Sequence, residues 1–229
     1  MARLFIYAEG QTEETFVKEL LRPHLFRHGY YQVEPRLSGT GGIKSWQRAR
    51  RDILKYLKED RERIVSTMVD YYALPQEEED AWPGRKHASA LPRAKRADHI
   101  AAELMKDIAS AMEHQFNPER FVPFVLMHEF EALLFSDCTK LSSAIEQPSL
   151  RKEFQKIRDS FDTPEEIDDS AETAPSKRIL KLLPTYQKPL FGNLAAVTIG
   201  LEAIRAQCPH FNRWLSQLES LTARGAAAE

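Results

Sequence analysis

The sequence LFIYAEGQTEE, residues 4–14, decides the fold that we expect. Its first five residues are apolar and suit a buried β-strand, and Gly10 then allows a sharp turn. Thr12 is positioned to cap a helix whose first turn contains the acids Glu13 and Glu14. The stretch therefore predicts a strand, an acidic turn and a helix. In an open α/β sheet such a turn lies at the carboxyl end of a strand, where ligands bind.

The acids of this turn, Glu9 and Glu13, have two interpretations. In the first, Glu9 is a solvated turn residue and Glu13 complements the positive end of the helix dipole. In the second, both carboxylates hold a hard divalent cation, because oxygen ligands at the end of a rigid strand suit Mg²⁺ or Mn²⁺. The turn is unlike a phosphate cradle, since it has one glycine, no following Lys-Ser/Thr pair, and carboxylates where an anion would bind.

The composition indicates a soluble globular protein. The chain has 229 residues, 42% of them hydrophobic and 29% charged, which suits one large domain or a domain with an appendage. The formal net charge of -2 gives no global attraction to nucleic acid but leaves room for a local basic face. Cys138 and Cys208 have no metal-binding spacing and are expected to be reduced thiols. With no recognisable signal peptide or membrane span, we expect a cytoplasmic protein without a membrane partner.

Three further β-like runs lie before residue 136, at residues 32–37, 64–69 and 121–127. The run at 64–69 ends on Asp70, which repeats the arrangement at Glu9. The run at 121–127 is followed at once by HEFE, so Glu129 and Glu131 occupy the same topological position. Parallel strands end at one edge of a sheet, and we therefore expect these acids to meet there. His128 could be a catalytic or metal-binding residue, but a lone histidine is more often structural.

Basic residues follow the second and third expected strands. The loop SGTGG, residues 38–42, leads into a basic helical stretch that begins at Lys44. A long irregular insertion at residues 76–92 leads into a helix from about Ala94 to His114. These cations are either solvated helix faces or contacts to the phosphate backbone of a nucleic acid. The candidates for phosphate contact are Lys44, Arg48, Arg85, Lys86 and Arg96.

The chain changes character after Ser136, where no further strand is recognisable. Residues 159–175 are polar and acidic, and two X-Pro pairs mark breaks in them. Helical runs follow at residues 176–183, 190–207 and 210–221. We therefore predict an α/β domain at residues 1–136 and a helical C-terminal appendage at residues 137–229.

Three motifs carry a resemblance to a known family: EGQTE at residues 9–13, VDYY at residues 69–72 and HEFE at residues 128–131. Together they cover about residues 3–136. The sequence resembles a bacterial family of uncharacterised proteins that are often encoded beside AAA-type ATPases. That family looks like a divergent branch of the Toprim fold, near the nuclease domains of overcoming-lysogenization-defect proteins. The resemblance implies an α/β fold, with a Toprim-like, mostly parallel four-stranded sheet flanked by helices and a helical C-terminal region.

The resemblance also implies roles for single residues. Glu9 matches the glutamate that Toprim domains place after their first strand, and Glu13 matches the second acid of the E-G-x-x-[D/E] variant. Asp70 matches the first aspartate of the D-x-D motif. Tyr72 stands where the second aspartate should be, which is a departure from the family pattern of metal coordination.

Glu129 or Glu131 could supply the carboxylate that Tyr72 replaces. On this reading the protein is a metal-dependent phosphodiesterase, a nuclease that cuts DNA or RNA with Mg²⁺ or Mn²⁺ as cofactor. The metal ligands would be Glu9, Glu13 and Asp70. The catalytic residues would be Glu9, Glu129 and Glu131.

The expected partners are nucleic acid and an AAA-type ATPase in a phage-defence type of system, and the oligomeric state, including a homodimer, is left open. A second hypothesis makes the protein a non-catalytic partner or sensor subunit of that ATPase, which the replacement of an aspartate by Tyr72 favours. A third makes it a Rossmann-like enzyme that acts on small phosphates. Metal titration separates the first two, and protection from thermal unfolding by nucleotide without metal would favour the third.

Overall fold

The structure is a computed structural model that describes residues 2–37, 39, 42–43, 45–77, 79–112, 116–167 and 173–226. The chain divides into two compact units, Met1–Val125 with Ser216–Glu229, and Leu126–Leu215. A compact unit need not be a domain, so the predicted boundary after Ser136 stays a prediction. Within the described residues, no helix combines the length and the apolar character that a membrane crossing requires.

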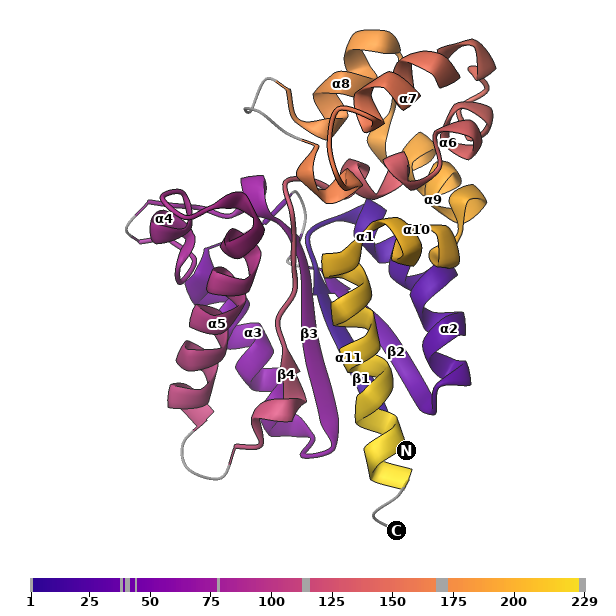
Figure 1. Cartoon of the computed structure of the whole chain (residues 1–229). Helices are drawn as coiled ribbons and strands as arrows, with labels where there is room; N and C mark the ends of the chain where they lie inside the picture. The colour runs from indigo at the N-terminus through magenta and orange to yellow at the C-terminus, as the bar shows by residue number, and fades with distance from the viewer. Residues whose placement is uncertain are drawn as a thin grey trace. The chain divides into compact units, whose positions relative to one another are not determined.

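The first unit is built on a parallel β-sheet with the strand order β2-β1-β3-β4 (Figure 1). Its strands are β1 (Ala2–Ala8), β2 (Tyr30–Leu37), β3 (Arg63–Asp70), β4 (Phe121–Val122) and β5 (Val125–Leu126), the last of which also pairs with β3. The predicted strand at 121–127 is thus split around Pro123, which has no N–H to donate to a neighbouring strand. The α/β class and the mostly parallel sheet are confirmed, and the described residues form five strands in place of four.

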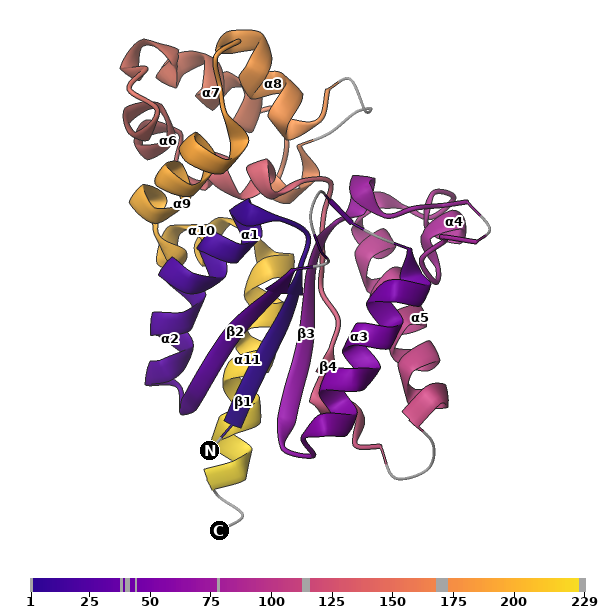
Figure 2. The same cartoon turned by 180° about the vertical axis from the view of Figure 1, so that it is seen from behind.

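Helices cover both faces of this sheet. Figure 1 shows α11 in front of the strands, and Figure 2, the view from behind, shows α3 in front of them. The helices of this unit are α1 (Gln11–Phe16), the π-helical turn η1 (Val17–Leu21), α2 (Arg22–Arg27), α3 (Trp46–Glu59), η2 (Tyr71–Ala73), α4 (Arg85–Ala88), α5 (Arg93–Met112), η3 (Pro118–Arg120) and, from Ser216 on, α11 (Pro209–Ala226). The π-helical turn η1 ends one residue before Arg22-Pro23, and the missing N–H of Pro23 removes one helical hydrogen bond.

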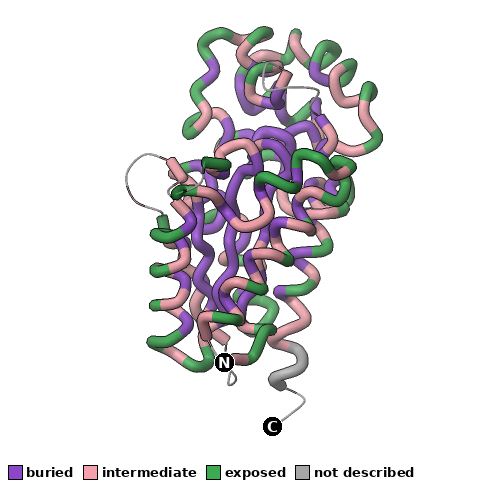
Figure 3. The backbone as a smooth tube through the Cα atoms, turned by 90° about the vertical axis from the view of Figure 1, so that its left-hand side faces the viewer, coloured by how far each residue is buried: buried purple, intermediate pink, exposed green. Residues whose placement is uncertain are grey.

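Because helices cover both faces of the sheet, the central strands do not alternate between buried and exposed residues. No residue in Leu4–Ala8 is more than 5% exposed, and the strands in the middle of this unit are purple in Figure 3. β3 is buried on both faces as well, although it carries Ser66 and Thr67. Their hydroxyls donate to the carbonyl oxygens of Val122 (2.5 Å) and Phe124 (2.8 Å), which satisfies them in the core.

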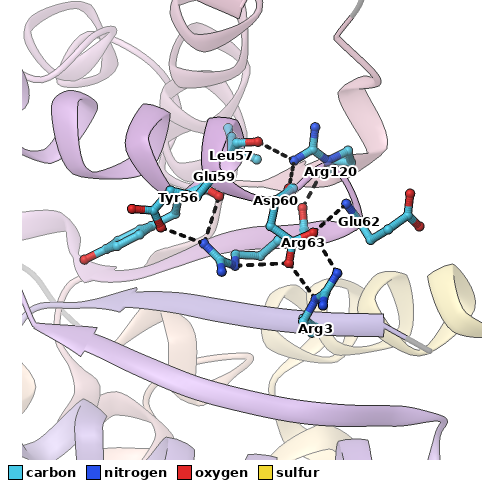
Figure 4. A network of polar contacts seen from close by, with 8 residues as sticks. All are labelled: Arg3, Tyr56, Leu57, Glu59, Asp60, Glu62, Arg63 and Arg120. Carbon is cyan, nitrogen blue, oxygen red and sulfur yellow. Dashed lines mark hydrogen bonds and ion pairs between the residues drawn. The ribbon is translucent and has the colours of Figure 1, made fainter.

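A polar network fastens the end of α3 to the amino ends of β1 and β3 (Figure 4). Asp60 follows α3 and accepts two contacts from Arg3, at 2.7 and 2.5 Å. Arg120, just before β4, donates to the carbonyl oxygens of Leu57 (2.6 Å) and Asp60 (2.5 Å). It also donates to the carbonyl of Arg63 at 3.1 Å. Because a helix leaves its last carbonyls without internal partners, Arg120 satisfies groups at the C-terminus of α3 that water would otherwise have to reach.

The second unit is helical, as predicted for the C-terminal part of the chain. Its elements are the 3₁₀-helix η4 (Phe130–Ser136), α6 (Cys138–Ala144), η5 (Pro148–Leu150), α7 (Arg151–Arg158), η6 (Pro164–Glu166), α8 (Pro175–Leu182), the π-helix η7 (Lys188–Gly192), α9 (Asn193–Ile199), α10 (Leu201–Gln207) and the first half of α11. The predicted single run at 190–207 is broken at Gly200, where φ is +83°. Both cysteines are buried thiols, and burial raises the pKa of Cys138 to about 12.

Two local predictions in the first unit need correction. The N-cap of α1 is Gly10, not Thr12, and Thr12 is buried within the first turn. The insertion at residues 76–92 was predicted to be irregular, but it contains the short helix α4, which begins after Gly84. Gly84 has φ +77°, and an added Cβ would lie 3.0 Å from Glu103, so only glycine fits this turn without movement of its neighbours.

Candidate functional site

The strand order places a topological switch point between β1 and β3. From β1 the chain moves to β2 on one side, and from β3 it moves to β4 on the other, so the connections diverge from two neighbouring strands. In open α/β sheets, ligands bind in the crevice at the carboxyl ends of such a pair. The register pairs Ala8 with Met68, which brings the residues that follow each strand together. Glu9 follows β1 directly, and Asp70 is the last residue of β3.

Glu9 and Asp70 are in contact at this edge of the sheet. The backbone N–H of Asp70 donates to Oε2 of Glu9 at 3.2 Å, across 61 residues of sequence. Asp70 is 3% exposed, while Glu9 is half-buried. A carboxyl group at the end of a fully buried strand is costly unless hydrogen bonds or a cation compensate for lost water. The structure therefore brings two of the predicted site residues to one place.

Glu13 adjoins them through Gly10. Its Oε2 accepts the backbone N–H of Gly10 at 3.0 Å, as the acid of a capping box does. Gly10 has no side chain to return the bond, so the cap is one-sided. Glu13 is only 2% exposed. Its capping bond supports the structural interpretation of this acid, and its burial beside the switch point is compatible with the metal-binding one.

The three acids form a loose group, not a preassembled cage. Within the described residues, a group of three metal-ligating side chains with all ligand atoms within 4.8 Å of one another is found elsewhere in the chain, and Glu9, Glu13 and Asp70 do not form such a group. Mg²⁺ keeps several of its waters and is often held by one or two carboxylates, so a wider spacing fits its coordination. The donor set of Glu9, Glu13 and Asp70 consists of oxygens alone, which suits Mg²⁺ or Mn²⁺ better than softer metals.

The residues after Asp70 form an aromatic and arginine cluster that the sequence did not reveal. Arg85 is 4% exposed and lies 3.9 Å from the ring centroid of Tyr71. Its guanidinium donates to the carbonyl oxygen and to the hydroxyl of Tyr71, at 3.1 and 3.0 Å. Burial lowers the pKa of Arg85. Tyr72, in the position of the second D-x-D aspartate, packs edge-on against Tyr71.

The predicted phosphate contact of Arg85 stays a prediction, and in the structure its guanidinium bonds to Tyr71. The Arg85 guanidinium would have to break its hydrogen bonds to Tyr71 before it could contact a phosphate group. We therefore treat Arg85 as a support for the segment after β3. Lys86, its neighbour, is exposed and remains a candidate for phosphate contact.

The two basic segments leave the same region of the first unit. The rings of Trp46, at the start of α3, and Trp82, in the insertion after β3, lie 5.0 Å apart. The backbone N–H of Trp46 also donates to the backbone carbonyl of Asp80. Arg48, in the first turn of α3, is exposed. Arg96 is half-buried and bonds to the carbonyls of Leu91 and Ser89, and Lys44 lies outside the described residues.

Glu129 and Glu131 belong to the second unit, so their predicted meeting with Glu9 and Asp70 stays a prediction. Within that unit, Oε2 of Glu129 accepts the backbone N–H of Ser176 at 2.9 Å, which caps the first turn of α8. Glu131 has no exposed surface, and Nζ of Lys188 lies 3.0 Å from its Oε2.

Burial raises the pKa of Glu131 to about 7, although Lys188 acts in the opposite direction. A carboxyl group that titrates near neutral pH is suited to general acid–base catalysis. His128, between the two acids, is completely buried and adopts φ +67°, a conformation that is uncommon outside glycine. Strained, buried residues with shifted pKa values gather at functional sites, which makes this segment a second place of interest in the chain.

The fold and these acids define a parallel α/β protein with carboxylates at its switch point. The chain belongs to a family described as a domain of unknown function (DUF4276), whose model matches residues 8–219. Comparison with curated proteins gave no match, and comparison with solved structures gave none either.

Proposed function

We propose that the protein is a metal-dependent phosphodiesterase that cuts DNA or RNA at the carboxyl edge of its sheet. The observation that carries the proposal is the contact between Glu9 and Asp70 at the switch point between β1 and β3. Asp70 is 3% exposed beside Glu9, and a buried carboxylate is costly unless hydrogen bonds or a cation compensate for the lost water. The resemblance to the Toprim family and to overcoming-lysogenization-defect nucleases supports the same chemistry.

Glu9, Glu13 and Asp70 are the residues that would hold the metal. A bound Mg²⁺ or Mn²⁺ supplies an activated water and stabilises negative charge on the phosphate. The chain itself orients the ligands, because the N–H of Asp70 directs the carboxylate of Glu9 and the N–H of Gly10 directs that of Glu13. Exposed cations on the same unit, Arg48 and Lys86, would hold the phosphate backbone without reading its sequence.

Glu131 is the residue best suited to move a proton in this proposal. Its pKa of about 7 places it between acid and base at neutral pH. The proposal requires that Glu131 reaches the substrate held by the first unit.

The nuclease assay tests the proposal with purified full-length chain and labelled single-stranded DNA, double-stranded DNA and RNA, each with and without Mn²⁺. We expect cleavage that requires the ion and falls at least about 100-fold in Glu9→Gln and Asp70→Asn. Glu79→Gln, which removes an exposed acid of the same unit, is the matched control and should cut normally. Metal-dependent cleavage that survives in both site variants would refute the assignment.

A non-catalytic role beside an AAA-type ATPase is the second candidate. Tyr72 favours it, because this side chain packs on Tyr71 where an active D-x-D motif would offer a second carboxylate. Calorimetric titration with Mn²⁺ separates the two functions. A chain that binds no divalent ion at Glu9 and Asp70 would retain only the partner role.

A further inference from the structure

Three potential metal ligands lie together at the far end of α2, away from the acids of the switch point in sequence. They are His24 in α2, His28 just after it and Glu219 in the second half of α11, and their ligand atoms all lie within 4.8 Å of one another. Nε2 of His24 is 2.6 Å from Oε1 of Glu219, and Nε2 of His28 is 3.9 Å from the same oxygen. Neither the family description nor the nuclease proposal assigns a task to this cluster.

The packing of α11 against the first unit brings Glu219 to the two histidines. The hydroxyl of Tyr30 donates to the carbonyl of Leu218 at 2.8 Å, one residue before Glu219. The hydroxyl of Thr222 donates to the carbonyl of His28. Gly29, between His28 and Tyr30, adopts φ +90°, a conformation that residues with a side chain rarely take. Contacts on both sides of Glu219, at Leu218 and Thr222, thus hold it beside the histidines.

The hydrogen bond of His28 determines which of its nitrogens is available. Nδ1 of His28 lies 3.0 Å from the backbone carbonyl of His24. A carbonyl can only accept, so Nδ1 carries the proton and Nε2 keeps its lone pair in the neutral ring. A histidine whose second nitrogen donates to a backbone carbonyl is the usual arrangement around metals, because that bond fixes both the tautomer and the ring orientation. The free nitrogen is the one nearer to Glu219.

The spacing also suits a tetrahedral ion. Ligands at about 2.0–2.1 Å from Zn²⁺ lie roughly 3.3 Å apart. The observed separations of 2.6 and 3.9 Å lie on either side of that value, so small side-chain rotations would reach it. The His28 side chain is 39% exposed, whereas those of His24 and Glu219 are 15% and 16% exposed. One side of the cluster is therefore open to solvent and to a fourth ligand such as water.

We propose that His24, His28 and Glu219 form a binding site for a transition-metal ion of the Zn²⁺ class. Two imidazoles and one carboxylate favour Zn²⁺, Co²⁺ or Ni²⁺ and disfavour Mg²⁺, which prefers oxygen ligands alone. In the metal-free protein Nε2–H of His24 donates to Glu219. When the ion binds at Nε2, that proton passes to solvent and the neutral ring carries its proton on Nδ1. The bound ion links α2 to a helix that is 195 residues away in sequence, and it stabilises the folded state by mass action.

Isothermal titration of the full-length, tag-free protein with Zn²⁺, in buffer with excess Mg²⁺, tests the site. Mg²⁺ in excess competes with Zn²⁺ for sites made of oxygen ligands alone and competes little for histidine nitrogens. We expect one Zn²⁺ per chain and an upward shift of the unfolding midpoint. His28→Ala, which removes the most exposed ligand, and Glu219→Gln should each weaken binding at least tenfold.

His87→Ala is the matched control, because it removes an exposed histidine of the same unit outside the cluster and should bind Zn²⁺ like the wild type. Glu9→Gln should also bind it normally, which keeps this result independent of the nuclease proposal. Co²⁺ gives a second readout, since a four-coordinate site absorbs visible light more strongly than a six-coordinate one. Unchanged Zn²⁺ binding in both His28→Ala and Glu219→Gln, or loss of binding in Glu9→Gln alone, would overturn the proposal.

Discussion

At the scale of one residue, Asp70 contributes both to the sheet and to the candidate metal site. Its backbone belongs to β3 and orients Glu9, while its own carboxyl group is 3% exposed at the switch point. A buried negative charge beside a second acid is a cost in the absence of a cation and a source of affinity in its presence. A change of the side chain alone therefore separates these two effects.

Asp70→Asn keeps the shape of the side chain and removes its charge. We expect the free energy of unfolding without metal to stay within about 1 kcal/mol of wild type or to rise, because charge repulsion with Glu9 is relieved. Affinity for Mn²⁺ should fall at least tenfold. Urea unfolding and calorimetric titration measure the two effects, and a protein that loses its fold would identify Asp70 as a structural hydrogen-bond acceptor.

Glu131 makes a second prediction at this scale, through pH. Its pKa in the folded protein is about 7, above the ordinary value of about 4.3, so the folded state binds the proton more tightly than the unfolded chain. The resulting stabilisation is complete below about pH 4 and is lost as the pH rises to 7. Glu131→Gln cannot ionise and should gain roughly 1–3 kcal/mol relative to wild type across this window.

Chemical unfolding at pH 5 and pH 7.5 measures the stability gain of Glu131→Gln relative to wild type. Glu153→Gln, which removes an exposed acid of the same unit, is the control and should show no such gain in stability. A Gln variant that loses stability toward neutral pH would instead mean that Lys188 keeps Glu131 ionised.

At the scale of elements, the end of α3 depends on a residue from outside the helix. Arg120 donates to three main-chain carbonyls, those of Leu57, Asp60 and Arg63, and burial lowers its pKa. Two of these carbonyls lie at or just after the C-terminus of α3, where the helix cannot satisfy them itself. Arg120 thereby strengthens the joint between α3, β3 and the segment before β4, to which Arg3 and Arg63 also contribute (Figure 4).

Arg120→Ala should lower the free energy of unfolding by about 2–4 kcal/mol, because it leaves partly buried carbonyls without a donor. The exposed Arg61 offers a matched control, and Arg61→Ala should change stability by less than about 0.5 kcal/mol. Urea unfolding of both variants measures the difference. Equal effects would mean that water replaces the Arg120 guanidinium without cost.

At the scale of the whole molecule, the net charge is -2, but the first unit carries exposed cations such as Arg48 and Lys86. Arg48 and Lys86 both follow strand ends of the parallel sheet, and the Trp46–Trp82 contact ties their segments together. A phosphate backbone bound near the acids would lie against such cations. The affinity of the whole chain for nucleic acid should therefore depend on salt.

The double variant Arg48→Ala, Lys86→Ala should flatten the dependence of log K on log salt concentration by up to about two units, since each phosphate contact contributes about 0.9. The fold should persist because both side chains are exposed. Fluorescence anisotropy with labelled DNA and RNA over a salt series gives the slope. Wild-type protein without salt-dependent binding, also in the presence of Mn²⁺ and an ATPase partner, would show that these residues only solvate helices.

Local patterns in the sequence were sufficient for much of the fold. The apolar run before Glu9, the turn at Gly10 and the start of the helix after it lie within residues 4–14, so the sequence predicted the strand-turn-helix unit directly. Asp70 was found in the same way, because it ends an apolar run. The register between β1 and β3 then brought it to Glu9.

Only the tertiary structure decided what depends on residues that are distant in sequence. The strand order, the burial of Arg85 against Tyr71 and the Arg120 joint all arise from non-local pairing, which periodicity cannot encode. The His24–His28 spacing of one helical turn was visible in the sequence, but Glu219 joins the pair only because α11 returns to the first unit. A metal site needs three ligands within a few ångströms of one point, and here the packing of two helices supplies the third.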